Sequence, residues 1–216
     1  MQRRNVEVQK SSPLAPLAPI MLKWFRVIDD YQRATLDVGD VPYWYNERAS
    51  LSTLAAAIWK SGGVALEEYK TTKTRGGPKK GKYEGRADLW FTWKGKDYVG
   101  EAKHVEFAMQ RRSTAEDTYA RTQRALKSAK KSVRLCPGAE GRRLEVVFVT
   151  PSVRKAYWDH GPTRAALLDA FHRGLERTDP CLLAWTRPRP TPFVKYDGKT
   201  WYYPIAAVVV RMLKRQ

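Results

Sequence analysis

Residues 85–103 read GRADLWFTWKGKDYVGEAK, and this stretch decides the fold. Within it, Asp88–Trp93 and Asp97–Lys103 are rich in aromatic and apolar residues, which favours β-strands. Lys94-Gly95-Lys96 lies between them and is typical of a tight turn. The sequence therefore predicts a β-hairpin, around which the rest of the chain is arranged.

The register of this hairpin depends on the length of its turn. If the turn has two residues, Trp93 pairs with Lys96, and counting back along the ladder places Asp88 opposite Glu101. Directly opposed residues share a face of the sheet with Cβ atoms ~5 Å apart. Strand alternation puts Lys103 on the same face as Glu101. Two carboxylates and one amine then converge, whereas a three-residue turn would shift the pairing by one position.

The segments around the hairpin alternate between helices and strands. Apolar spacing predicts helices over 22–36, 44–60, 115–135 and 163–177. Short β-rich runs predict strands over 64–69, 144–150, 182–186, 193–196 and 199–203, while 206–213 is a strand or a helix. A Gly-, Lys- and Arg-rich loop is expected over 71–82. This order predicts an α/β fold with one mixed central sheet flanked by helices.

The chain is expected to form one domain after a Pro-rich arm. Prolines repeat at helix-breaking spacing over 11–19, so residues 1–20 are expected to be flexible and extended or polyproline-like. Residues 21–216 then form a single domain. No apolar run reaches the ~20 residues that span a bilayer, and the N-terminal residues have no clean apolar block. Neither a membrane segment nor a secretory signal is expected.

Charge is the strongest compositional signal. The 216 residues include 40 Lys and Arg against 22 Asp and Glu, a formal net charge of +18. Such an excess destabilises a compact chain unless a polyanion is nearby, and nucleic acid is the commonest one. An anionic membrane is the competing partner, but the basic residues are scattered along the chain rather than gathered in one block. The eight Trp and eleven Tyr offer stacking faces for unpaired bases, although most are expected in the core.

Cysteine and histidine content argues against disulfides and zinc. Cys136 and Cys181 are too few for a disulfide framework or a four-thiolate zinc site. They are interpreted as small, half-buried thiols in a reducing cytoplasm. His104, His160 and His172 show no paired metal spacing. A cytoplasmic protein without zinc chemistry is therefore expected.

The expected carboxylate pair favours a different metal. Two close carboxylates repel each other and prefer a divalent cation between them. Oxygen ligands with open water positions suit Mg²⁺, with Mn²⁺ as a substitute, and the carbonyl of Ala102 between Glu101 and Lys103 can add a ligand. Lys103 would orient or deprotonate a water that attacks a phosphodiester, or stabilise charge on the phosphate. The alternative is a surface hairpin in which Asp88 or Glu101 forms ordinary salt bridges with Lys103 or Arg86.

The motif of Asp88, a hairpin and Glu101-Ala102-Lys103 resembles that of the PD-(D/E)xK nuclease superfamily. The resemblance covers roughly residues 44–150, with residues 151–216 as a C-terminal extension. It implies a restriction-endonuclease-like mixed sheet, Mg²⁺-dependent phosphodiester hydrolysis, and Asp88, Glu101 and Lys103 as the catalytic set. Ala87 stands where the family name has Pro, a position that is permissive in the family.

The resemblance also implies residues outside the hairpin. Many members add a glutamate from the first core helix, here as a further catalytic residue that holds one or two Mg²⁺ ions with Asp88 and Glu101; Glu47 is the best match, and Glu67 or Glu68 on the preceding strand is the fallback. Some members place Gln and Tyr after the lysine strand, and Tyr119 and Gln123 fill that place.

Two basic segments are candidates for gripping a nucleic-acid backbone. A loop and a helix face each gather positive side chains, and an ordinary solvated surface is the alternative for both. The candidates are Lys79, Lys80, Lys82 and Arg86 near the loop, and Arg121, Arg124, Lys127 and Lys131 on the helix, beside Tyr119 and Gln123.

The sequence therefore predicts a Mg²⁺-dependent nuclease that acts on DNA rather than RNA. The first alternative is a non-catalytic basic nucleic-acid-binding module, such as a subunit of a larger nucleoprotein machine. The second is an interaction protein whose charge serves assembly. A homodimer and a protein partner stay open, as does the choice between endonuclease and exonuclease.

Overall fold

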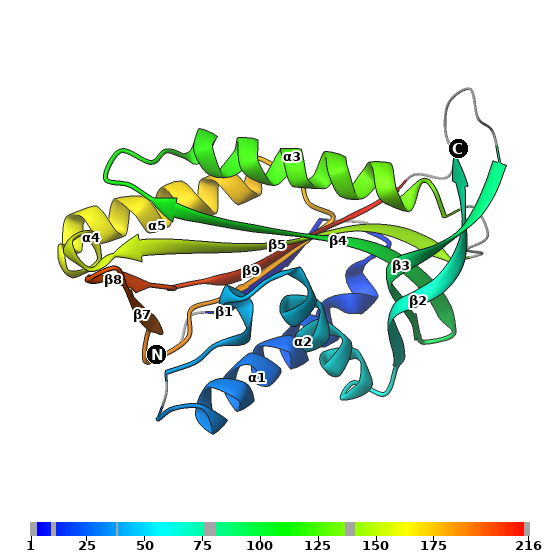
Figure 1. Ribbon diagram of the computed structural model, residues 1–216, viewed down its shortest axis with the longest axis horizontal. Coiled ribbons are helices and arrows are strands. Elements are labelled where there is room, and N and C mark those ends of the chain that lie inside the picture. The colour runs from blue at the N-terminus through cyan, green and yellow to red at the C-terminus, as the bar shows by residue number, and fades with distance from the viewer. Residues whose placement is uncertain (1–3, 10–11, 38, 76–80, 137–140, 214–216) are drawn as a thin grey trace.

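The computed structural model describes residues 4–9, 12–37, 39–75, 81–136 and 141–213. Within them, one nine-stranded mixed sheet has the order β1-β6-β9-β5-β4-β3-β2, and a β7–β8 hairpin joins it through β8 and β5 (Figure 1). The pairing of β4 with β5 is parallel, and the other pairs are antiparallel. The strands are β1 (Arg4–Val8), β2 (Val64–Arg75), β3 (Gly81–Trp93), β4 (Lys96–Met109), β5 (Arg142–Arg154), β6 (Leu182–Thr186), β7 (Phe193–Tyr196), β8 (Lys199–Tyr202) and β9 (Ala206–Met212).

Helices cover both faces of the sheet. Helices α1 (Ala18–Ala34) and α2 (Glu47–Trp59) lie on one face, and α3 (Ala115–Val133) and α5 (Gly161–Glu176) lie on the other (Figure 1). The short elements are η1 (Ala15–Leu17), η2 (Pro42–Trp44) and α4 (Lys155–Asp159). The predicted α/β class with a mixed sheet flanked by helices is therefore confirmed. Over the described ranges, every helix is too short or too polar to cross a lipid bilayer.

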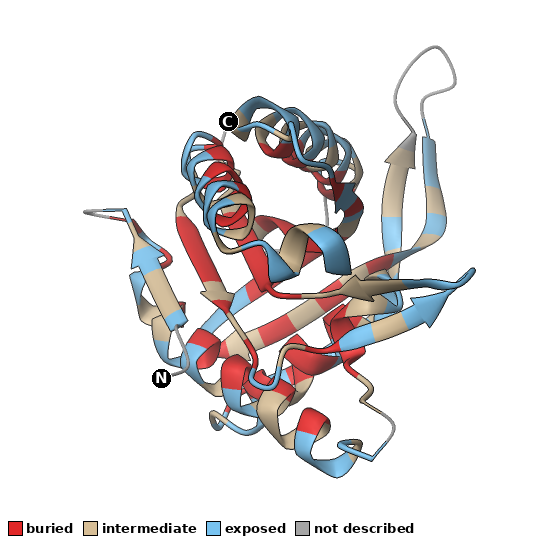
Figure 2. Cartoon of the chain, turned by 90° about the vertical axis from the view of Figure 1, so that its left-hand side faces the viewer, coloured by how far each residue is buried: buried red, intermediate tan, exposed pale blue. Residues whose placement is uncertain are grey.

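The position of β5 in the middle of the sheet explains its unbroken apolar sequence. Val146 and Phe148 belong to the core beneath α1 and α2, whereas Val147 and Val149 belong to the core beneath α3 and α5. Both faces of the strand are covered, so alternation with polar residues is lost. Buried residues follow the sheet and the inner sides of the helices, and exposed residues follow the outer sides (Figure 2).

The N-terminal segment corrects the expectation of a loose arm over residues 1–20. Residues 4–8 form β1 and pair with β6 at the edge of the sheet. Leu14, Leu17 and Ile20 are buried, so the apolar residues that alternate with the prolines pack into the core. The carbonyl of Pro16 also accepts a hydrogen bond of 2.9 Å from the Trp93 indole. This segment is part of the domain in its described residues, 4–9 and 12–20.

A second correction concerns the loop expected over 71–82. Strand β2 continues to Arg75 and β3 begins at Gly81, with pairs running from Thr71↔Gly85 to Arg75↔Gly81. The alternating threonines and lysines of this stretch suit a two-stranded ribbon that is solvated on one face. The intervening residues 76–80 lie outside the described ranges.

Other elements agree with the sequence pattern. The predicted strand over 182–186 is confirmed at both ends, and 206–213 proves to be a strand, β9. Residues 151–216 supply β6, β8 and β9 to the same sheet as the predicted core, so they do not form a separate layer.

Candidate active site

The β3–β4 hairpin has the two-residue turn on which the sequence argument depends. Lys94 and Gly95 have positive φ angles of 50° and 69°, the left-handed conformation that a tight hairpin turn requires. Trp93 pairs with Lys96, and the ladder runs without a shift to Leu89↔Gly100. The predicted register is confirmed over this stretch.

Beyond that last pair the two strands separate, and we call this place the fork. Strand β3 continues toward Gly81 with β2, while β4 continues toward Met109 with β5. Among the described strands, none pairs with the edge of β4 that β3 leaves after Gly100. Backbone groups on this edge are therefore available to side chains.

Four predicted side chains meet at the fork. A carboxylate oxygen of Asp88 accepts a 2.8 Å hydrogen bond from the backbone N–H of Ala102. The Nζ atom of Lys103 lies 3.9 Å from that oxygen of Asp88 and 3.3 Å from both carboxylate oxygens of Glu47. The carboxyl groups of Glu101 and Asp88 are also within hydrogen-bonding reach. The structure thus brings Glu47, Asp88, Glu101 and Lys103 together.

Glu101 is the buried member of this group. Its side chain is 4% exposed, and Nζ of Lys73, itself 12% exposed, lies 2.7 Å from its Oε1 atom. Burial raises the pKa of Glu101, the bond with Lys73 lowers it, and the charge of Asp88 raises it again, for a net increase. Glu101 is therefore a carboxyl group whose negative charge needs a cation beside it.

Lys73 is a site residue that the sequence argument missed. It was assigned to a loop, but strand β2 extends through it and turns its side chain toward β4. Cys136, just beyond α3, donates a weak 3.7 Å hydrogen bond to Glu101, and burial raises the pKa of this thiol to about 11. Cys136 is thus a neutral, buried thiol that helps to enclose Glu101.

Glu47 is the third carboxylate near Lys103. It is the first residue of α2, which begins at Glu47 because the side chain of Asn46 accepts a 2.9 Å hydrogen bond from the Ala49 N–H. The backbone N–H of His104, on the open edge of β4, lies near the Glu47 carboxylate and favours its charged form. Burial raises the pKa of Glu47, and Lys103 opposes that rise.

The fallback glutamates have other partners. Glu67 accepts a 2.7 Å hydrogen bond from Ser52. Glu68 pairs with Arg48 at 2.6 Å and with Arg86 at 3.2 Å. Of the three candidates, the structure brings Glu47 to Lys103.

The chemistry of these donors fits a hard divalent cation. Besides the carboxylates of Asp88 and Glu101, the carbonyl of Ala102 is an oxygen donor at the fork, and it accepts a hydrogen bond from the Lys103 amine. In the arrangement that the structure describes, no three His, Cys, Asp or Glu side chains already stand at ligand positions. Lys73 and Lys103 are the cations that face these carboxylates instead. Binding an ion here requires the side chains of Asp88 and Glu101 to turn from these partners toward the Ala102 carbonyl.

The residues expected to contact nucleic acid divide into three groups: exposed side chains, residues outside the described ranges, and residues that have protein partners. Arg124, Lys127 and Lys131 are exposed on α3, and Lys82 is exposed at the start of β3. Lys79 and Lys80 lie outside the described residues.

Arg86, Arg121, Tyr119 and Gln123 form the group that has protein partners. Arg86 pairs with Glu68, and Arg121 lies over the Phe107 ring with 5.2 Å between its Cζ atom and the centroid.

Tyr119 and Gln123 lie on α3, the helix that follows the lysine strand β4, and their side chains contact the end of α5. The Arg177 guanidinium lies 4.7 Å from the Tyr119 ring centroid, and Gln123 donates a 3.3 Å hydrogen bond to the Thr178 carbonyl. Both side chains therefore join α3 to the end of α5.

An aromatic cleft lies further along the open edge of β4. Its volume is about 560 Å³. From Ala102 to Glu106 the strand advances about 13 Å, so the cleft begins a short distance from Lys103. The Tyr203 hydroxyl donates a 3.1 Å hydrogen bond to Glu106 on its wall. The cleft is lined by Trp44, Glu106, Phe107, Ala108, Ser152, Val194, Tyr196, Trp201 and Tyr203.

Comparison with protein-family models, with curated proteins and with solved structures gives no match for this chain.

Proposed function

We propose that the protein is a divalent-metal-dependent nuclease with a restriction-endonuclease-like fold, and that it hydrolyses phosphodiester bonds of DNA. The observation that carries the proposal is the meeting of Glu47, Asp88, Glu101 and Lys103 at the fork. These residues come from α2, β3 and β4, so only the folded chain assembles them. Such a mixture of acids and an amine suits hydrolysis of an anionic ester.

Each residue has a role in this proposal. Asp88, Glu101 and the Ala102 carbonyl would hold a Mg²⁺ or Mn²⁺ ion, which would supply charge neutralisation and a more acidic water. Lys103 orients that water or stabilises charge on the phosphate, and Glu47 holds the Lys103 amine in place through the contacts of 3.3 Å.

The aromatic cleft supports a substrate with unpaired bases. Bases stack on aromatic side chains whatever their sequence. Tyr196 is 75% exposed on the cleft wall, and the ring centroids of Trp44 and Tyr203 lie 5.3 Å apart. A strand whose phosphate lies at the fork can place neighbouring bases against these rings. The net charge of +18 supports attraction of the phosphate backbone.

One observation favours a second candidate, a non-catalytic nucleic-acid-binding module. Lys73 pairs with Glu101, and Lys103 pairs with Glu47 and lies near Asp88, so two amines already offset most of the charge of the three carboxylates without a metal. Such a module keeps salt-sensitive DNA binding and lacks cleavage that depends on divalent ions.

Cleavage and metal binding separate the two candidates. Supercoiled plasmid and single-stranded DNA are incubated with the protein in Mg²⁺, in Mn²⁺ and in chelator, and the melting temperature is measured under the same conditions. The nuclease is expected to cut with either metal and to gain thermal stability from it, and Asp88→Asn should lose both effects. Asp97→Asn, an exposed acid of the same hairpin, is the matched control. DNA binding without cleavage or a metal-induced thermal shift would establish the non-catalytic module.

A further inference from the structure

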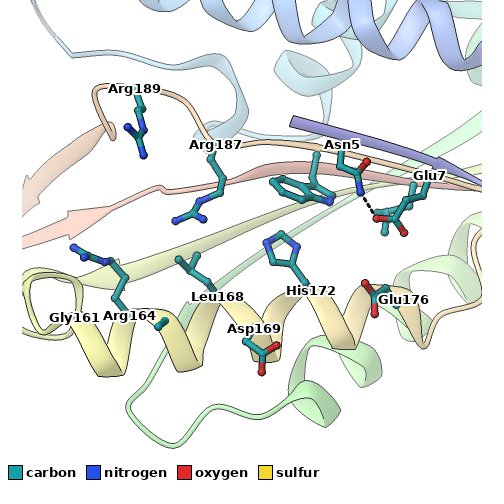
Figure 3. Close-up of a pocket in the computed structure, with 13 residues that line it drawn as sticks. Asn5, Glu7, Gly161, Arg164, Leu168, Asp169, His172, Glu176, Arg187 and Arg189 are labelled. Carbon is teal, nitrogen blue, oxygen red and sulfur yellow. Dashed lines mark hydrogen bonds between the residues drawn. The ribbon is translucent and has the colours of Figure 1, made fainter. Parts of the chain in front are cut away.

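A second cavity lies at the opposite edge of the sheet from the fork. It has a volume of about 620 Å³ and is enclosed by β1, β6 and α5, with the segment after β6 at one end (Figure 3). Strands β1 and β6 begin the order of the sheet, and β3 and β2 end it, so this cavity is separate from the proposed active site. Its volume is in the range of ~300–1,000 Å³ typical of small-molecule sites.

One end of the cavity is strongly basic. Arg164, Arg187 and Arg189 gather there in Figure 3, and the same three residues line an adjoining cavity of about 360 Å³. Arg164 donates a 3.1 Å hydrogen bond to the Trp158 carbonyl, and its Cζ atom lies 5.4 Å from the Trp158 ring centroid. These neutral contacts hold the side chain without cancelling its charge. Among ion pairs of the described residues, none joins Arg164 or Arg189 to a carboxylate.

The middle of the cavity has an aromatic wall, with Asp169 of α5 nearby. The rings of His172 and Trp185 lie 4.3 Å apart between centroids, with 42° between their planes. Burial and then the charge of Arg187 lower the pKa of His172 to about 4, so its ring is neutral near pH 7. Within the described structure, its buried Nδ1 atom has no hydrogen-bond partner. The wall thus suits contact with a planar ring.

The other end of the cavity presents acceptors. Glu7, Asn5 and Glu176 lie there, away from the arginines (Figure 3). Asn5 donates a hydrogen bond to Glu7. Burial and the charge of Glu176 raise the pKa of Glu7, which shows that the two carboxyl groups are close enough to repel each other. An N–H donor of a ligand would relieve that repulsion.

We propose that this cavity binds a nucleoside 5′-phosphate, either as a free nucleotide or as the 5′ end of a nucleic-acid strand. The phosphate lies against Arg164, Arg187 and Arg189, because guanidinium groups bind phosphate oxygens in paired hydrogen bonds. The base lies along Trp185 and His172. Its exocyclic amino group points to Glu7 and Glu176, so adenine, guanine and cytosine are favoured over thymine. Inorganic phosphate alone would leave the wall and the acceptors unused.

Calorimetric titration tests this site in chelator, so that the outcome does not depend on the proposed nuclease activity. The protein is titrated with dAMP, dTMP, deoxyadenosine and inorganic phosphate, and with short DNA strands that carry a 5′-phosphate or a 5′-hydroxyl. We expect dAMP to bind more tightly than dTMP, and both to bind more tightly than the nucleoside or phosphate. Binding of dAMP identifies a free nucleotide as the source, and binding of the 5′-phosphorylated strand alone identifies a strand end.

Charge-removing variants locate the bound phosphate. Arg189→Gln changes an exposed side chain, so it should fold normally, and we expect it to raise the dissociation constant about tenfold, with a similar effect from Arg187→Gln. Arg33→Gln removes an equal charge from the surface of α1, where the side chain is 75% exposed, and is the matched control. Affinity that is unchanged in both cavity variants, equal binding of deoxyadenosine and dAMP, or no binding of any phosphate would overturn the proposal.

Discussion

The amine of Lys73 lies 2.7 Å from Oε1 of Glu101, and the two side chains are 12% and 4% exposed. This ion pair joins β2 to β4 across the fork, over a strand, β3, that lies between them in the sheet. A carboxylate as buried as Glu101 stays ionised only with a cation beside it. The amine is therefore what keeps Glu101 in the form that a metal ion requires.

Removing Lys73 is expected to destabilise the fold. Lys73→Met leaves Glu101 buried without its cation, and the free energy of unfolding should fall by about 3–5 kcal/mol in urea denaturation at pH 7. The loss should be smaller at pH 5, because the pKa of Glu101 is already raised and rises further in the variant, so that the folded state takes up a proton there.

Two further variants check this assignment. Adding Glu101→Gln to Lys73→Met should recover most of the lost stability, since no buried charge then remains. Lys70→Met, on the same strand as Lys73, breaks an exposed pair with Glu84 of β3 and should cost about 1 kcal/mol at most. If Lys73→Met matched Lys70→Met in stability, the pair would have no role in holding Glu101 ionised.

The role proposed for Lys103 predicts a loss of rate with little change in DNA affinity. Lys103→Met should lower the cleavage rate about 10²–10⁴-fold, the range for a group that handles protons or developing charge. Single-turnover cleavage measures the rate, and binding is measured separately in chelator. Lys96→Met, at the exposed start of β4 beside the hairpin turn, is the control and should cut normally. Full activity of Lys103→Met would remove the lysine from the mechanism.

The aromatic cleft predicts a preference for unpaired DNA. Tyr196→Ala removes one exposed ring and should weaken binding of single-stranded DNA by about 1–3 kcal/mol while affecting duplex binding less. Fluorescence anisotropy at fixed ionic strength gives both affinities. Trp59→Leu removes an aromatic ring that is 54% exposed at the far end of α2. This control should leave the ratio of the affinities for single-stranded and duplex DNA unchanged. Equal losses for single strands and duplexes would contradict stacking in the cleft.

His172 predicts a specific acid sensitivity. Its folded-state pKa is lowered to about 4 from the ordinary 6.5, so the unfolded chain takes up the proton first as the pH falls. The contribution of neutral His172 to the free energy of unfolding is complete above pH 6.5 and is lost as the pH falls toward 4. Between pH 7 and 5, the wild type should lose at most about 2 kcal/mol more than His172→Gln in urea denaturation without added nucleotide. Parallel pH profiles of the two proteins would show that His172 titrates normally.

The hairpin and its register were predictable because their determinants are local. Lys94 and Gly95 fix a two-residue turn, and simple counting then leads from Trp93 and Lys96 to the end of the ladder at Leu89 and Gly100. Glu47 could also be predicted, because an acidic residue at the start of a helix that precedes a β-meander can be recognised in the sequence. Only the folded chain, however, distinguishes it from Glu67.

The features that were missed depend on contacts between distant segments. Lys73 lies in a stretch whose Gly- and Lys-rich end suggested a loop, and pairing with β3 makes it a strand. The prolines near residue 16 suggested an arm, yet the leucines between them find the core. The aromatic cleft joins η2 to the β7–β8 hairpin, about 150 residues later, and no local pattern relates two such segments.

The fork also bears on how the protein avoids sticking to itself. Asp88 accepts a hydrogen bond from the backbone amide of Ala102, Glu47 lies near the amide of His104, and Lys103 donates to the Ala102 carbonyl. The proposed catalytic side chains therefore also cover the open edge of β4. Removing these side chains would expose unpaired backbone N–H and C=O groups, to which another polypeptide could add a strand. Substitutions that remove these side chains would then promote self-association. Loss of the catalytic residues would therefore require other groups to cover the strand edge.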